Sequence, residues 1–67
     1  MTILFKEGSI GWEGALDDAV IRYRDLRLVG LTDRKIENAM VEKAVHISAA
    51  DWPRFFDQVK RHFEFRY

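Results

Sequence analysis

Few residues of this sequence could carry nucleophilic or acid–base chemistry. The chain has two histidines, two serines, two threonines and no cysteine. A nucleophile needs an adjacent, oriented base, and no serine or threonine lies in a glycine-flanked elbow. His46 and Ser48 share one side of an expected strand, but that spacing alone is a weak signal. His62, near the end of an expected helix, fits a dipole-stabilised surface residue. We therefore expect no catalytic residue and no enzyme activity.

Metal and cofactor sites are also poorly supported. Glu13, Asp17 and Asp18 form an acidic cluster in which Glu13 and Asp17 lie one helical turn apart. Carboxylates in the first turns of a helix ordinarily serve the helix dipole, and a metal site needs three or four convergent ligands. The evenly spaced glycines 8, 11 and 14 lack the residues of a phosphate-binding loop. We expect neither a metal nor a cofactor.

Residues 25–39 contain the most specific local pattern. Gly30 is followed by Thr32 and, four residues later, by the apolar Ile36. The segment resembles the turn of helix-turn-helix DNA-binding proteins, with Gly30 at the turn and Thr32 at the start of the second helix. The resemblance implies a DNA-binding regulator whose second helix lies in the major groove. The residues that would then face the DNA are Asp33, Arg34, Lys35 and Asn38.

The same segment departs from that family at several positions. Leu26 stands where the family usually has a small residue, and a larger side chain there would force the two helices apart. Asp33 and Glu37 would bring negative charge towards the phosphates. An ordinary two-helix corner produces the same pattern, so DNA binding is the alternative hypothesis and not the leading one.

Composition limits the size and charge of the molecule. The 67 residues suffice for one small domain, residues 1–67, and eleven basic side chains balance eleven acidic ones. Zero net charge argues against nucleic-acid binding through bulk charge. A core this small is marginal, and oligomerisation is one usual remedy. The other is aromatic weight, here five phenylalanines, two tryptophans and two tyrosines.

Hydropathy gives no sign of a membrane protein. No apolar run approaches the ~20 residues that span a bilayer. The first residues become charged too soon for a signal peptide. We expect a cytoplasmic protein with no membrane partner.

The leading hypothesis is a small, non-enzymatic protein–protein interaction module that acts as an adaptor, inhibitor or regulator. The aromatic residues exceed what one small helix pair can hide. Arginine and tyrosine are also over-represented among interface hot spots. The partner is another protein, with a second copy of the chain as a further option. The residues predicted to contact it are Arg22, Arg24, Arg27, Phe65 and Tyr67.

Helical periodicity predicts the elements that hold these residues. Apolar side chains share one face of residues 12–27, which indicates a helix. The alternative is a β-hairpin that turns at Asp17 and Asp18, with residues 20–31 as a long strand. A second helix is expected at about residues 33–43. A third covers residues 52–63, with an apolar side formed by Trp52, Phe55, Phe56, Val59 and Phe63.

Three further segments have the composition or period of strands. They are residues 2–7, residues 43–48 and the C-terminal residues 63–67, where aromatic side chains alternate with charged ones. The predicted fold class is therefore α+β, a small sheet of two or three short strands with about three helices on one face. The alternative is an N-terminal half rich in β-hairpins with one C-terminal helix.

Overall fold

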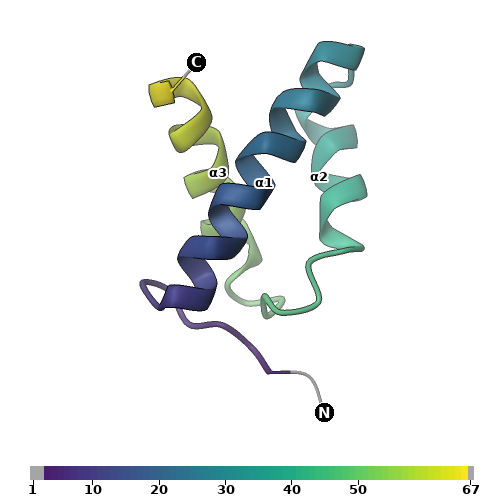
Figure 1. Ribbon diagram of the computed structural model, residues 1–67. Helices are drawn as coiled ribbons and strands as arrows, with labels where there is room; N and C mark the ends of the chain where they lie inside the picture. Colours follow the sequence, from purple (N-terminus) through teal and green to yellow (C-terminus); the bar gives the residue numbers. More distant parts are fainter. Residues whose placement is uncertain (1–2, 67) are drawn as a thin grey trace.

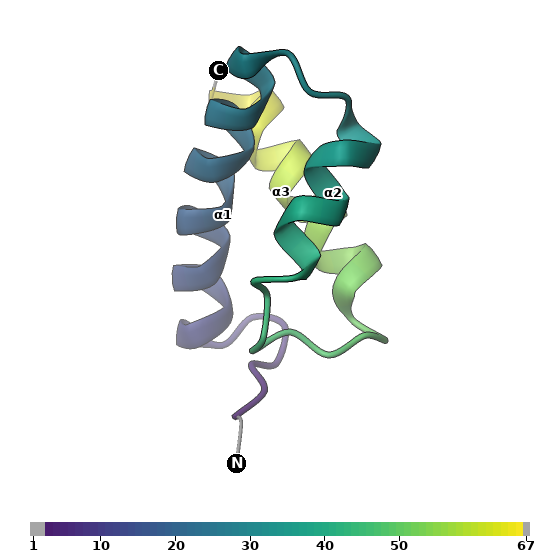
Figure 2. The same cartoon turned by 90° about the vertical axis from the view of Figure 1, so that its right-hand side faces the viewer.

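A computed structural model shows the protein as three helices and describes residues 3–66 (Figure 1). Helix α1 spans Ile10–Val29, α2 spans Asp33–Val41 and α3 spans Trp52–Arg66. Helix α2 runs back beside α1, while α3 lies behind the two in the turned view (Figure 2). The α+β prediction is wrong, since the described residues contain no strand. The β-hairpin alternative is wrong for the same reason, and the helix predicted at residues 12–27 is confirmed.

Both ends of α1 have side-chain or backbone caps. The Ser9 hydroxyl accepts a hydrogen bond from the Trp12 amide at 3.2 Å, which satisfies one of the first-turn donors. Gly30 ends the helix with a φ of 101°, a left-handed conformation that glycine adopts without steric cost. Two residues later, the Thr32 hydroxyl accepts from the Lys35 amide and starts α2. The corner between the helices is therefore set by local sequence.

The hydrophobic core lies mainly between α1 and α3. The Trp12 and Phe55 rings meet edge to face with centroids 5.1 Å apart. Tyr23 makes similar contacts with Phe56 at 5.9 Å and Phe63 at 5.2 Å. Such aromatic pairs contribute beyond the area they bury. The apolar faces predicted for residues 12–27 and 52–63 therefore pack on each other.

Both tryptophan indoles have partners for their N–H groups. Nε1 of Trp12 donates to Oε1 of Gln58 at 2.8 Å, and Nε1 of Trp52 donates to Oε2 of Glu37 at 2.9 Å. Within residues 3–66, no buried side-chain nitrogen or oxygen lacks a hydrogen-bond partner. The aromatic core is therefore also satisfied in its polar atoms, which a small domain needs.

The first and second predicted strands lie side by side without forming a ladder. The Phe5 amide donates to the His46 carbonyl at 2.8 Å, and the two rings stack with centroids 4.8 Å apart. Residues 42–51 form turns, so the second segment offers no regular edge. Both segments contain apolar residues, as their composition indicated. The one backbone hydrogen bond between them does not make a sheet.

The third predicted strand is part of α3. Phe63 faces Tyr23, whereas Phe65 is 93% exposed. The alternation of residues 63–67 is too short to outweigh continuation of a helix that is already formed. Tyr67, the last residue of that predicted strand, lies outside the described residues.

The N-terminal segment crosses the start of α1. The Phe5 ring packs on Gly11, where a Cβ would lie 2.5 Å from Cδ1 of Phe5. The Glu7 carboxylate accepts from Arg54 at 2.8 Å and from Gln58 at 2.5 Å. Gly11 therefore permits a close contact that ties the N-terminal segment to α1 and α3.

No helix within residues 3–66 combines the length and apolar character needed to cross a membrane.

Candidate partner-binding groove

A groove with a volume of about 180 Å³ lies between α1 and the loop that joins α2 to α3. Its apolar lining includes the core residues Met40, Ile47, Trp52 and Phe55. These side chains are buried in the core but contribute surface to the groove. The groove therefore opens onto the same aromatic layer that holds the helices together.

Small side chains on α1 create the hollow. Ala15 and Ala19 lie one helical turn apart, and both are half-buried along the groove wall. Ala44 and the exposed Val45 line it from the loop. Because methyl groups fill little volume, the helix and the loop meet without closing the space between them.

The rim is more basic than acidic. Arg22 and Lys43 line the groove together with one acidic residue, Asp18, and with His46. None of the ion pairs between described residues involves Arg22 or Lys43. Two exposed cations therefore stand beside an apolar hollow, available to an anionic partner.

His46 is fixed at one end of the rim. Its Nδ1 lies 2.8 Å from the carbonyl oxygen of Ile3. Because a carbonyl can only accept, Nδ1 carries the proton and Nε2 of the neutral ring remains an acceptor. The Phe5 stack holds the ring from the other side. His46 is thus positioned by the N-terminal segment, and none of the hydrogen bonds within residues 3–66 joins it to Ser48.

Of the five residues predicted to bind a partner, the four that the structure describes do not form one surface. Arg22 lies at the groove, whereas Arg24 pairs with its neighbour Asp25 at 3.1 Å. Arg27 belongs to the corner between α1 and α2, described below. Phe65 is exposed at the end of α3, and the fifth residue, Tyr67, lies outside the described residues. Of the predicted contact residues that the structure describes, Arg22 alone lines the groove.

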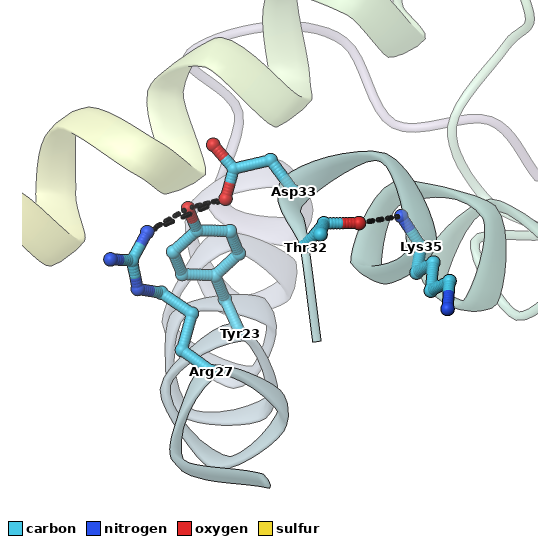
Figure 3. A network of polar contacts seen from close by, with 5 residues as sticks. All are labelled: Tyr23, Arg27, Thr32, Asp33 and Lys35. Atoms are coloured by element: carbon cyan, nitrogen blue, oxygen red, sulfur yellow. Dashed lines mark hydrogen bonds and ion pairs between the residues drawn. The ribbon is translucent and has the colours of Figure 1, made fainter. Parts of the chain in front are cut away.

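Arg27 is part of a polar network at the α1–α2 corner (Figure 3). The buried Tyr23 hydroxyl donates to Oδ1 of Asp33 at 2.6 Å and accepts from Nη1 of Arg27 at 3.1 Å. The guanidinium also lies 5.3 Å from the centroid of the Phe63 ring. These contacts join all three helices, so Arg27 has a structural role.

The same network shifts two pKa values. Burial raises the pKa of Tyr23, and its hydrogen bond to the Asp33 carboxylate raises that pKa further. The hydrogen bond to Tyr23 raises the pKa of Arg27. Both shifts favour the protonated form of the group concerned.

The residues implied by the helix-turn-helix resemblance lie on α2. Arg34, Lys35 and Asn38 are exposed, as a DNA-contacting set would need to be. Asp33, by contrast, is held by Tyr23. The predicted turn glycine and the predicted start of the second helix are confirmed by the left-handed Gly30 and the Thr32 cap. DNA contact itself remains a prediction.

The acidic residues of α1, namely Glu13, Asp17 and Asp18, are exposed. Across the described chain, no group of three or more histidine or acidic side chains is arranged to hold a metal ion. Asp17 instead pairs with Arg66 at 3.3 Å. The carboxylates are distributed along exposed parts of the helix.

Sequence reasoning missed the groove because it assigned residues 43–48 to a strand. Ala15 and Ala19 belong to the apolar face predicted for residues 12–27, but both leave space beside them. Their spacing, one helical turn apart, was the available signal. It could not be interpreted without knowing which segment lies opposite.

The chain has no match among the known proteins compared with it: no family model, no curated protein and no solved structure. The functional evidence therefore comes from its own residues.

Proposed function

We propose that this protein is a non-enzymatic protein-interaction module. Its groove binds an apolar side chain from an acidic segment of another protein. The observation that carries the proposal is the pairing of an apolar hollow with the exposed cations Arg22 and Lys43.

The size of the hollow favours a side chain over a whole small molecule. Its volume of about 180 Å³ is below the ~300–1,000 Å³ of usual small-molecule pockets. Interfaces commonly insert a few side chains into such hollows and surround them with less critical contacts. One leucine-sized anchor suits this geometry.

The charges select the flanking residues. Arg22 and Lys43 line the groove from α1 and from the loop, so acidic residues beside the anchor would meet a cation from either element. Asp18 at the same rim would repel a densely acidic segment. A partner with isolated acidic residues around one apolar anchor fits best. Such pairs act mainly on specificity and association rate.

Isotope-labelled protein titrated with a designed peptide tests the proposal. The probe has one leucine flanked by glutamates, and matched peptides replace the leucine by alanine or the glutamates by glutamine. We expect saturable amide shifts around Lys43 and Ile47 with the first peptide and weaker ones with both controls. Equal shifts with all three peptides, or no shifts at the groove, would contradict the proposal.

Variants of the protein separate groove binding from general charge attraction. Arg22→Glu and Lys43→Glu should each weaken binding of the first peptide. Ala19→Leu should also weaken it, because the larger side chain fills the hollow. Arg34→Glu makes the same charge change at an exposed position of α2, away from the groove, and should leave peptide binding unchanged. Equal loss from Arg34→Glu would mean that net charge, and not the groove, attracts the peptide.

DNA binding is the second candidate, because the Gly30 turn, the Thr32 cap and the exposed Arg34, Lys35 and Asn38 fit the helix-turn-helix pattern. It predicts duplex DNA binding that weakens steeply with salt. Anisotropy with a labelled duplex at low salt, repeated with Lys35→Glu, tests it. Absence of binding at low salt would remove this candidate.

A further inference from the structure

The outward face of α1 carries a stripe of solvent-exposed apolar residues. Ile10 is 94% exposed, Ile21 46% and Leu28 80%. At about 100° per residue, these positions and Gly14 fall within an arc of roughly 40°. The stripe lies opposite the buried face of the same helix. We define it as the α1 stripe: Ile10, Gly14, Ile21 and Leu28.

Gly14 has no explanation within a single chain. Glycine inside a helix is destabilising relative to alanine. At Gly11 the structure supplies a reason, because the Phe5 ring leaves no room for a Cβ. A Cβ at Gly14 would meet no atom within 4 Å. Its position in the α1 stripe suggests that the missing side chain makes room for something outside the chain.

We propose that the α1 stripe binds the same stripe of a second copy, with the two helices antiparallel about a two-fold axis near Ile21. Ile21 then meets Ile21 of the second copy. Positions equally distant from the axis face each other, so Gly14 lies opposite Leu28 of the second copy. The small residue thus leaves room for a leucine side chain.

Charge complementarity selects the antiparallel arrangement. Asp17 and Arg24 lie along the same edge of the α1 stripe, about equally far from Ile21 in opposite directions. In the antiparallel pair, Asp17 of each copy approaches Arg24 of the other. In a parallel pair, each would approach its own kind. A two-fold interface of this type is self-complementary by construction.

The existing ion pairs do not prevent this contact. Asp17 pairs with Arg66 and Arg24 with Asp25, and all four side chains are partly solvent-exposed. Exposed ion pairs contribute little and can be shared with a new partner.

The dimer should be weak and depend on concentration. The other edge of the stripe carries Asp18 and Asp25 against Arg22, and two copies bring those acidic residues together. A single helix stripe also buries less surface area than the interface of an obligate dimer. We expect association between micromolar and millimolar protein.

Sedimentation and charge reversal test the pairing. Sedimentation equilibrium should show the mass rising from one chain to two with concentration. Asp17→Arg and Arg24→Asp should each weaken self-association about tenfold or more, while an equimolar mixture of the two variants should associate. One chain mass at every concentration, or no effect of either reversal, would overturn the proposal.

Cross-linking locates the axis, because the chain has no cysteine of its own. Under mild oxidation, Ile21→Cys should form a disulfide-linked dimer. Asn38→Cys, an exposed position on α2, should remain a single chain. Equal cross-linking of both variants would indicate random collision and overturn the assignment. Circular dichroism verifies that each exposed substitution leaves the helices intact. The peptide titration of the groove is independent, so either proposal can fail alone.

Discussion

The indole Nε1 of Trp12 donates a hydrogen bond of 2.8 Å to Oε1 of Gln58, joining residues 46 positions apart in the chain. The Trp12 side chain is fully buried, whereas Gln58 is only half-buried and also donates to Glu7. Gln58 therefore connects the aromatic core to the N-terminal segment.

Gln58→Ala should destabilise the fold by about 1–3 kcal/mol, because it leaves a buried indole N–H without an acceptor. Chemical denaturation followed by tryptophan fluorescence measures the loss. In a Trp12→Phe background the same substitution should cost less, since the N–H is already gone. An equal cost in both backgrounds would show that the hydrogen bond is not responsible.

Two glycine-to-alanine substitutions should have opposite signs. Gly30→Ala should destabilise by about 1–2 kcal/mol, since alanine tolerates the left-handed conformation poorly. Gly14→Ala should stabilise the single chain by about 0.5–1 kcal/mol, because the helix gains a better former and the Cβ meets nothing. Thermal unfolding of dilute protein, below the range of self-association, compares them. The same sign for both would contradict the assigned roles.

Acid should loosen the N-terminal segment. The hydrogen bond from Arg54 lowers the pKa of Glu7 below its usual 4.5. A lowered pKa stabilises the fold above the unfolded value, and that contribution is lost as the pH falls through the folded-state pKa. The amide resonances of residues 5–9 should therefore shift below about pH 4.5. Glu7→Gln should remove the pH dependence of these resonances that is due to protonation of Glu7. If the pH dependence is unchanged in this variant, other carboxylates are responsible.

Alkali should destabilise the α1–α2 corner. Burial raises the pKa of Tyr23 above its usual 10.0. A raised pKa stabilises the fold fully below the unfolded value, and the contribution is lost as the pH rises through the folded-state value. Tyr23→Phe should remove this component of alkaline unfolding while costing about 0.5–1.5 kcal/mol at neutral pH through the lost hydrogen bonds. Denaturation midpoints across the alkaline range would show both effects, and identical alkaline profiles would exclude Tyr23 as the titrating group.

The helices could be predicted from sequence because their apolar faces are one-sided. Trp12, Leu16, Val20 and Tyr23 recur at helical spacing and are all buried. The polar caps Ser9 and Thr32 and the glycine at position 30 mark the boundaries. Ile21 broke the pattern, and it is one of the side chains exposed on the α1 stripe.

The strands were mispredicted because composition does not identify a pairing partner. The apolar side chain of Phe5 packs on Gly11 and His46, but the residue does not belong to a strand. Val45 and Ile47 line the groove from a loop. Their spacing of two residues is the same as that of side chains on one face of a strand, so the sequence could not distinguish the two. Only the fold shows which side chains meet, so the groove could not be predicted. The separation of Arg22 from Arg27, in contrast, follows from the predicted helix, because five residues at about 100° each place the two side chains on different sides of it.

The unequal share of the core has a dynamic consequence. Helix α2 buries only Ile36 and Met40, whereas α1 and α3 each bury four side chains. Segments with fewer buried contacts open at lower free energy. In hydrogen-exchange measurements, the amides of α2 should exchange well before those of α1 and α3. The molecule would then behave as a stable unit of α1 and α3 that carries the less stable α2 between them in the chain.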